Sequence, residues 1–321
     1  MCTSFLLLTG CDGEPDDRFE KQVHSAVVEL RDGVTEKELS TGTRVVMLGT
    51  GTPVPDAYRA GAGIAIVHKG EAYLFDVGPG TVQNAITARY KYDIPSLYPT
   101  EICCVFLTHL HSDHTLDYSE LNFTLWWRRR ERLLAFGPSG LTEMTDGMLA
   151  MMQPDIRLRS SGDQPVEQAA VYAPVATEIG EGIVFEKDDL TVEAFAVSHG
   201  EIRPAFGYRV TTDDLTIVIS GDTAYSERLL EMATGADILI HEYISNEGLL
   251  RTSTAFQAYH RKSHTITTDL GRLASEAKPG LLVLYHGLHY GLPEQDALAE
   301  VKAVYDGNVV LASDLDSFPV Q

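Results

Sequence analysis

The sequence predicts an α/β fold in which layered β-sheets are covered by helices. Two observations carry this prediction: apolar, β-rich runs follow one another in the first half of the chain, and helix and strand patterns alternate in the second half. Because a sheet or a helix must bury its apolar face against another element, stacked sheets flanked by helices satisfy this pattern.

In the first half we expect three strands, a helix, a buried strand and then a loop that enters a second helix. Lys69 and Gly70 supply the turn between the second and third strands. The segments are RVVMLGTG (44–51), GAGIAIVHKGEAYLFDVGPG (61–80), TVQNAITARY (81–90), EICCVFLTH (101–109) and GPSGLTEMTDGMLAMM (137–152).

In the second half we expect a strand, a hairpin that turns at residues 212–214, and three repeats of a helix followed by a strand. This alternation is typical of a sheet with helices on one face. The segments are LTVEAFAVSH (190–199), AFGYRVTTDDLTIVISGDT (205–223), SERLLEMATGADILIHEY (226–243), TTDLGRLASEAKPGLLVLYH (267–286) and PEQDALAEVKAVYDGNVVLASD (293–314).

The composition is that of a soluble globular protein, with 44% hydrophobic and 22% charged residues. The length of 321 residues suits one domain with additions. The net charge of -21, from 46 acidic and 25 basic residues, would repel a polyanion. The composition therefore disfavours nucleic acid as a partner.

The N-terminal segment MCTSFLLLTGC places a short apolar run before Cys11 and resembles a bacterial lipobox, although a positively charged start is missing. We therefore expect a lipoprotein signal over residues 1–11 with a lipid anchor at Cys11, an acidic tether over 12–42 and the catalytic domain over 43–321. The expected location is the periplasm or a membrane surface. Without the signal, the expected location is the cytoplasm.

Two of the four cysteines, Cys103 and Cys104, lie in the apolar run ICCVFLTH. We expect them to be small buried hydrophobes, since adjacent cysteines rarely bridge each other.

Four potential metal ligands fall within six residues directly after the predicted buried strand: His109, His111, Asp113 and His114. A spacing of two along an extended chain points the first two side chains in the same direction. Imidazole nitrogens suit zinc, and a carboxylate can turn toward a second ion. This density of ligands predicts a metal site.

Three further candidates, His199, Asp222 and His286, each follow an apolar strand, in AFAVSH, TIVISGD and LLVLYH. Because strand ends converge at one edge of a sheet, we expect these side chains to join the first four. A charge such as Asp222 after an apolar strand needs a partner, and a metal ion supplies one.

The segment THLHSDH matches the HxHxDH signature of the metallo-β-lactamase superfamily, and SHG, SGDT and LYH resemble its later ligand motifs in the same order. The resemblance covers about residues 44–315. It implies a four-layer αββα sandwich with two metal ions, for which we expect Zn²⁺, with Mn²⁺ or Fe²⁺ as alternatives. The implied ligand sets are His109, His111 and His199 for one ion, Asp113, His114 and His286 for the other, and Asp222 as the bridge.

Within the superfamily, Asp222 together with IHEY and KSHTI resembles the branch of the transfer-RNA 3′-processing endonucleases (RNase Z-like) and the zinc-dependent arylsulfatases. In that branch, residues matching Glu242 and His264 form a pair beside the metals. The resemblance thus implies catalytic roles for Asp113, Glu242 and His264. Tyr243 stands where the endonucleases have a small residue.

We therefore predict a dinuclear metal-dependent hydrolase of phosphodiesters or aryl sulfates, with a metal-bridging hydroxide as the nucleophile. Metal binding lowers the pKa of water to about 7, and two ions stabilise both the attacking and the leaving oxygen. His264, held by Glu242, would then stabilise charge or protonate the leaving oxygen. The expected partner is a small anionic ester, and a homodimer is a further hypothesis.

Three alternatives stay open: an RNase Z-like endonuclease, a β-lactam or lactone hydrolase, and a non-catalytic metal-binding protein. Against transfer RNA stand the acidic surface and the short connection between FGYRV (206–210) and SGDT (220–223), where such endonucleases carry a long RNA-gripping arm. Against a non-catalytic protein stands the presence of all seven ligands.

Two segments are predicted to overhang the site: LNFTLWWRRRERLL, downstream of the metal loop, and NEGLLRTSTAFQAYHRKSH, before His264. Aromatic rings would form its walls and arginines would meet an anionic ester. The competing interpretation is that the tryptophans are packed and residues 128–130 form a solvated helix face. The residues concerned are Trp126, Trp127, Phe256, Tyr259, Arg128 and Arg251.

Overall fold

The computed structural model describes residues 42–162, 166 and 171–319. The predicted signal, the lipid anchor at Cys11 and nearly all of the predicted tether lie outside the described residues. In the part of the chain that the structure describes, no helix combines the length and the apolar character needed to cross a bilayer.

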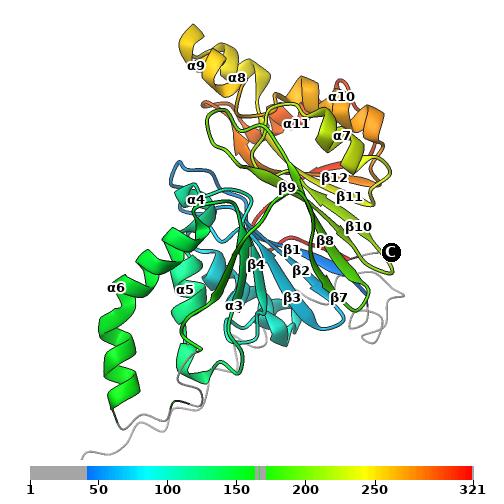
Figure 1. Cartoon of the computed structure of the whole chain (residues 1–321). Helices are drawn as coiled ribbons and strands as arrows, with labels where there is room; N and C mark the ends of the chain where they lie inside the picture. Colours follow the sequence, from blue (N-terminus) through cyan, green and yellow to red (C-terminus); the bar gives the residue numbers. More distant parts are fainter. Residues whose placement is uncertain (1–41, 163–165, 167–170, 320–321) are drawn as a thin grey trace, which may run out of the picture. The chain divides into compact units, whose positions relative to one another are not determined.

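Two sheets of seven strands each lie face to face (Figure 1). The first sheet has the order β14-β1-β2-β3-β4-β5-β6, and the second has the order β13-β12-β11-β10-β9-β8-β7. In these orders, the strands of the first sheet are Ser317–Pro319, Arg44–Gly49, Gly63–His68, Glu71–Phe75, Cys104–Phe106, Leu134–Gly137 and Val175–Glu178. Those of the second are Val309–Leu311, Leu281–Leu288, Ile238–Ile244, Thr216–Ile219, Phe206–Thr211, Leu190–Ala196 and Gly182–Lys187.

Helices cover the outer face of each sheet, which confirms the αββα sandwich (Figure 1). On the first sheet these are α3 (Thr81–Tyr92), α5 (Tyr118–Phe123) and α6 (Leu141–Ser161). On the second they are α7 (Glu227–Ala233), α10 (Thr267–Ala277) and α11 (Glu294–Lys302). The short helices are α4 (Ser112–Thr115), α8 (Asn246–Leu250) and α9 (Thr254–His260), with single 3₁₀ turns at Pro95–Leu97 and Trp126–Arg128.

Both faces of the central strands are buried, which explains their continuous apolar sequences. In β1, Val46 and Leu48 pack under the helices of the first sheet, whereas Val45 and Met47 pack between the two sheets. Successive side chains of a strand point to opposite faces, so one run of apolar residues serves two cores.

Helices α8 and α9 lie outside the sandwich, beyond one end of the second sheet (Figure 1). Helix α8 rests on a small apolar cluster of its own, in which Leu249 packs with Ile244 and Ile266, and which is separate from the three large cores.

The strand and helix predictions for residues 44–109 and 190–314 are confirmed, including the hairpin of β9 and β10. Four strands were missed: β5, β6, β7 and β14. Three of them, β6, β7 and β14, lie at sheet edges. The side chains of β6 and β7 are mostly exposed or half-buried, so these strands lack an apolar pattern that would reveal them.

Cys103 and Cys104 are joined by a disulfide, which contradicts the expectation that these neighbours stay unpaired. The expected packing is confirmed, because Cys104 is fully buried between the sheets and Cys103 packs against the same cluster.

The prediction that Trp126 and Trp127 form a wall of the site is wrong. Trp126 is fully buried in the core under the helices of the first sheet, where its indole N–H donates to Asp155 of α6 at 2.9 Å. Trp127 packs against the same core, with the Arg159 guanidinium 3.4 Å from its ring centre. These rings anchor α6 to the sheet.

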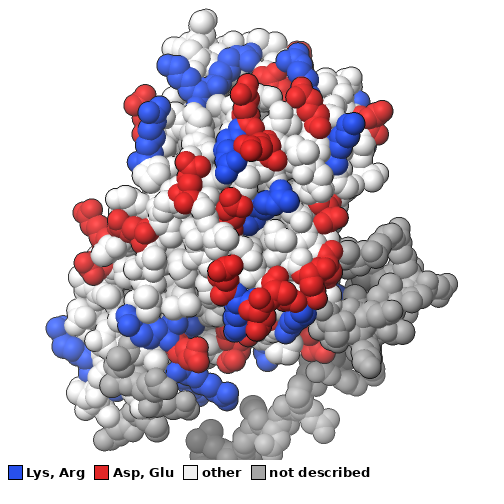
Figure 2. Space-filling model, turned by 45° about the vertical axis from the view of Figure 1, so that its right-hand side comes forward, with Lys and Arg blue, Asp and Glu red and all other residues white. Residues whose placement is uncertain are grey.

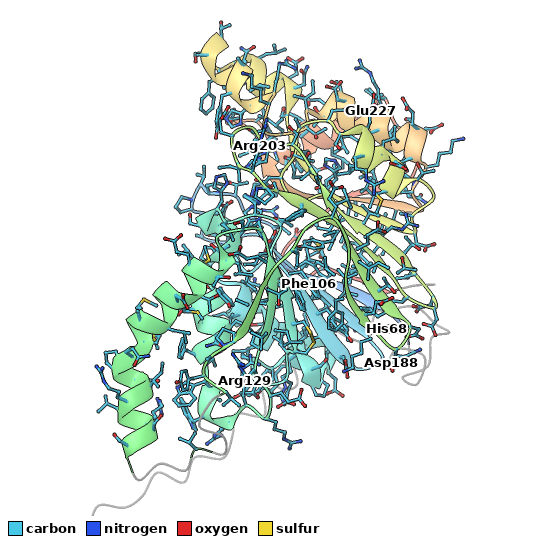
Figure 3. The ribbon with its side chains drawn as sticks, in the orientation of Figure 1. His68, Phe106, Arg129, Asp188, Arg203 and Glu227 are labelled. Atoms are coloured by element: carbon cyan, nitrogen blue, oxygen red, sulfur yellow. A yellow bond between two sulfur atoms is a disulfide. The ribbon has the colours of Figure 1, made fainter. Side chains whose placement is uncertain are left out.

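Arg129 is buried, unlike its exposed neighbours Arg128 and Arg130, so a solvated face describes only those two neighbours. Its guanidinium donates to the carbonyls of Ile102 at 3.0 Å and Leu121 at 3.1 Å, and also to that of Pro99. Burial lowers the pKa of Arg129 to about 10, which leaves it charged at neutral pH. Figure 3 shows Arg129 below Phe106. Arg129 lies at the end of β4 opposite the loop of residues 109–114, which we call the ligand loop.

We predict that Arg129→Met lowers the free energy of unfolding by about 2–4 kcal/mol, because it leaves buried carbonyls without donors. Urea denaturation at pH 7 measures this change. The matched control is Arg130→Met, which alters the exposed neighbouring residue and should change stability by less than about 0.5 kcal/mol. Equal effects of the two substitutions would contradict the structural role of Arg129.

Candidate metal centre

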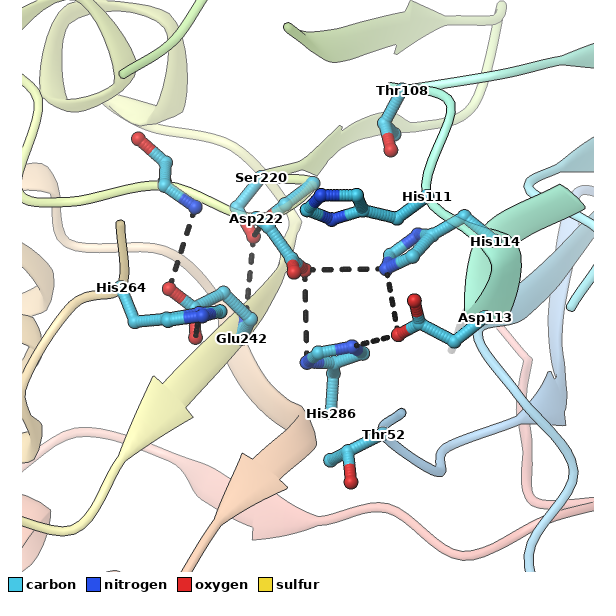
Figure 4. Close-up of polar contacts among 12 residues, drawn as sticks. Thr52, Thr108, His111, Asp113, His114, Ser220, Asp222, Glu242, His264 and His286 are labelled. Carbon is cyan, nitrogen blue, oxygen red and sulfur yellow. Dashed lines mark hydrogen bonds and ion pairs between the residues drawn. The ribbon is translucent and has the colours of Figure 1, made fainter. Parts of the chain in front are cut away.

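Strands of both sheets lead to polar residues at one edge of the sandwich, where the structure brings all seven predicted ligands together. Figure 4 labels His111, Asp113, His114, Asp222 and His286 among them. Strand β4 leads into the loop that carries the HxHxDH motif, and β8 and β10 lead to His199 and Asp222. His286 lies within β12, at a left-handed backbone position. The ligand set thus assembles from segments far apart in the sequence.

The first group consists of His109, His111 and His199. The Nδ1 atom of His111 lies 2.9 Å from Nε2 of His109 and 3.3 Å from Nε2 of His199. Burial lowers the pKa of all three rings, which keeps their imidazoles neutral. Neutral imidazole nitrogens that face one another are the ligands that a divalent transition metal takes.

The second group forms a closed ring of contacts (Figure 4). Asp113 Oδ2 lies 3.1 Å from His286 Nε2 and 3.5 Å from His114 Nε2. Asp222 Oδ1 completes the ring at 3.5 Å from His114 Nε2 and 3.6 Å from His286 Nδ1. The four side chains surround a common point.

Three atoms of this ring are buried without a hydrogen-bond partner: His114 Nε2, His286 Nδ1 and Asp222 Oδ1. Leaving such atoms unpaired costs about 1–3 kcal/mol each. A divalent ion would satisfy them, and so these residues fit a metal.

Asp222 lies between the two groups, since its other oxygen, Oδ2, is 3.8 Å from His199 Nε2. Burial on its own would raise the pKa of this carboxyl group, but His286 and His114 outweigh burial and hold the pKa well below its usual value. Asp222 is therefore an anion, placed where a bridging ligand is needed. This position agrees with the role that the resemblance implies.

Sequence reasoning missed Asp76, which follows β3. One of its oxygens accepts from the Thr108 N–H at 2.8 Å, and the other accepts from the Thr108 hydroxyl and from His114 Nδ1, both at 2.8 Å. Asp76 thereby fixes the ring of His114 with Nε2 facing the centre. The signal was present, because Asp76 is an isolated acid after an apolar strand, as Asp222 is.

A glycine turn supports the ligand loop. The carbonyl of Asp113 accepts from the Ala62 N–H at 3.0 Å, and Val77 N donates to the carbonyl of His114 at 2.8 Å. A Cβ atom on Gly78 would lie 2.0 Å from the Asp113 carbonyl oxygen. Only glycine therefore lets the two segments approach this closely.

The predicted catalytic pair is in contact beside the ligands: His264 Nδ1 lies 3.2 Å from Glu242 Oε2. The fully buried Glu242 is itself held by the Thr265 N–H, which donates to Oε1 at 2.8 Å. Burial lowers the pKa of His264, but the carboxylate of Glu242 more than offsets this effect and raises the pKa to about 9. The His264 ring centre is 5.2 Å from that of His199, so the pair faces the first group.

Comparisons with known proteins agree with this geometry. A family model described as a beta-lactamase superfamily domain matches residues 71–286. A ribonuclease Z of Mycobacterium sp. (strain KMS) is 31% identical over 277 residues, which cover 84% of this chain and 94% of that protein. A ribonuclease Z of Mycobacterium marinum is 29% identical over 286 residues, covering 84% and 96%.

Solved structures share the fold. The metallo-beta-lactamase fold protein YhfI from Bacillus subtilis superposes with a TM-score of 0.65 at 18% identity, covering 87% of this chain and 100% of that one. The short form of human tRNase Z superposes with a TM-score of 0.61 at 22% identity, covering 87% and 99%.

We predict that Asp76→Asn weakens metal binding about 10- to 100-fold, because the amide group no longer offers His114 a carboxylate acceptor. Competition with a chromophoric chelator measures the affinity. The control is Asp306→Asn, which changes an exposed aspartate on the helical side of the second sheet and should leave metal affinity as it is. If Asp76→Asn bound metal as tightly as the wild-type protein, Asp76 would have no role in metal binding.

Proposed function

The chain belongs to the metallo-β-lactamase superfamily, in its RNase Z-like branch, and we propose that it is a metal-dependent phosphodiesterase that cleaves precursor transfer RNA at its 3′ side. The observation that carries this proposal is the Glu242–His264 pair beside the seven ligands. The similarity to ribonuclease Z over 94% of that relative's length supports it.

This proposal reverses the order of two hypotheses. The acidic surface and the short connection between β9 and β10 favour small phosphodiesters and aryl sulfates over transfer RNA. That connection is a tight hairpin turn after Thr211. Similarity to ribonuclease Z over 84% of this chain and 94% of that protein nevertheless favours RNA, and small esters remain the second hypothesis.

The residues of the site divide the chemistry among them. When bound, divalent ions would lower the pKa of water to about 7 and offset the charge of the reacting phosphate. His264 lies beside the ligands with one nitrogen on Glu242, which leaves Nε2 to donate a proton to the departing oxygen. Asp113 lies against His286 and offers a carboxylate that can accept a proton.

A substrate panel tests the proposal with the full chain loaded with Zn²⁺ or Mn²⁺. We expect metal-dependent cleavage of precursor transfer RNA at the end of the acceptor stem, together with turnover of bis(p-nitrophenyl) phosphate, and loss of both after chelation. Turnover of p-nitrophenyl sulfate or of a β-lactam without RNA cleavage would replace the proposal by the corresponding alternative. Metal binding without any turnover would identify a non-catalytic protein.

We further predict that His264→Ala lowers kcat about 10²- to 10⁴-fold while metal content is kept, because a positioned proton donor is lost. Steady-state kinetics with bis(p-nitrophenyl) phosphate and metal analysis measure the two quantities.

The matched control is His68→Ala, which removes another buried histidine. Strand β2 begins next to the ligand loop, where the Ala62 N–H meets the Asp113 carbonyl, and it ends at His68, so this residue lies at the far end of the sheet (Figure 3). The kcat of His68→Ala should match that of the wild-type protein. If His264→Ala kept full activity, His264 would have no catalytic role.

A further inference from the structure

An open hollow of about 290 Å³ borders the metal centre, between the loop after β8 and helix α9. Tyr259 lines one end of it. An adjoining hollow, which Arg203 lines, shares Gly200, Glu201 and Lys262 with the first. Because these three residues line both hollows, we treat them as one groove, running from Tyr259 to Arg203, and call it the α9 groove.

Residues of the α9 groove contact a predicted metal ligand. His199 Nδ1 donates to the carbonyl of Ser263, a groove residue, at 2.8 Å, and the Gly200 N–H donates to the carbonyl of Lys262 at 2.9 Å. His264 follows Ser263 in the chain. A substrate whose reacting group lies at the centre therefore has the groove as an adjacent recess for one of its two ester substituents.

One end of the groove is aromatic and exposed. Tyr259 is 55% exposed and Phe256 is 41% exposed. Their rings stack with centres 6.2 Å apart and an angle of 29° between their planes. An exposed stacked pair of rings is a surface on which a nucleobase stacks, at about 1–3 kcal/mol per base.

The rest of the groove carries two cations, Lys262 and Arg203, and one carboxylate, Glu201. Lys262 and Arg203 are both exposed, and within residues 42–162, 166 and 171–319 no carboxylate forms an ion pair with either side chain. Some exposed cations elsewhere, such as Lys69 and Arg272, do pair with carboxylates. Figure 2 shows further Lys and Arg side chains near the upper end of the molecule, where α8 and α9 lie.

We propose that the α9 groove binds the nucleotide next to the scissile phosphodiester, with its base on Tyr259 and its own phosphate between Lys262 and Arg203. The proposal rests on the proposed function and adds the residues that select a nucleotide. Glu201, which also lines the groove, offers its carboxylate to ribose hydroxyl groups. Stacking adds affinity that does not depend on the net charge of the protein.

The test compares two ligands that differ only by the base. Adenosine monophosphate and ribose 5-phosphate are titrated into the metal-loaded full chain by calorimetry, and the same ligands are used as competitive inhibitors of bis(p-nitrophenyl) phosphate hydrolysis. Tyr259→Ala should raise the Kd of adenosine monophosphate about tenfold and leave that of ribose 5-phosphate within a factor of two. Lys262→Gln should raise both constants severalfold.

Two variants serve as matched controls. Tyr90→Ala removes an exposed tyrosine on α3, and Arg261→Gln removes the exposed cation beside Lys262 that does not line the groove. Neither should alter either constant. Circular dichroism and thermal melting show that all variants are folded.

The outcomes distinguish a failure of nucleotide binding in the groove from a failure of the proposed function. Three results would overturn nucleotide binding in the groove, even if phosphodiesters are cleaved. Tyr259→Ala could raise the Kd of both ligands equally, or Lys262→Gln could leave both constants unchanged. The third result is that the wild-type chain does not bind adenosine monophosphate. The expected changes in Kd without any phosphodiester turnover would uphold nucleotide binding and overturn the proposed function.

Discussion

Burial of six polar side chains, with the half-buried His111 beside them, at one edge of a sandwich is the constraint on which the rest of the structure depends. Buried ionisable groups are unfavourable unless each finds a partner of opposite charge or a hydrogen bond. Here the carboxylates of Asp113 and Asp222 and five imidazoles meet within a few ångströms, and three of their atoms have no hydrogen-bond partner among the described residues. A divalent cation resolves this deficit, and the glycine turn and Asp76 hold the side chains ready for it.

Much of this arrangement could be predicted from the sequence, for a physical reason. Strands buried on both faces must be apolar throughout, so a polar residue at the end of such a strand stands out. His199, Asp222 and His286 were found in this way, and all three lie at the centre. Asp76 obeys the same rule, because it follows the apolar strand β3.

Other features could not be predicted, because the pattern that would reveal them is absent or ambiguous. Strands β6 and β7 expose most of their side chains, and edge strands of this kind resemble loops in sequence. The tryptophans at 126 and 127 are equally suited to a core and to a binding wall, and only the packing of α6 shows that they belong to the core. Net charge likewise describes a whole surface and not one groove.

The position of α8 and α9 outside the sandwich separates two requirements of an enzyme, which are the alignment of the reacting groups and the selection of the substrate. Helix α8 rests on a small apolar cluster of its own, apart from the cores that align the ligands. Evolution could therefore replace the two helices with a segment of different shape while the reaction centre stayed intact. Related chains would then share one chemistry and diverge in what they accept, with the change confined to residues 246–260, ahead of His264.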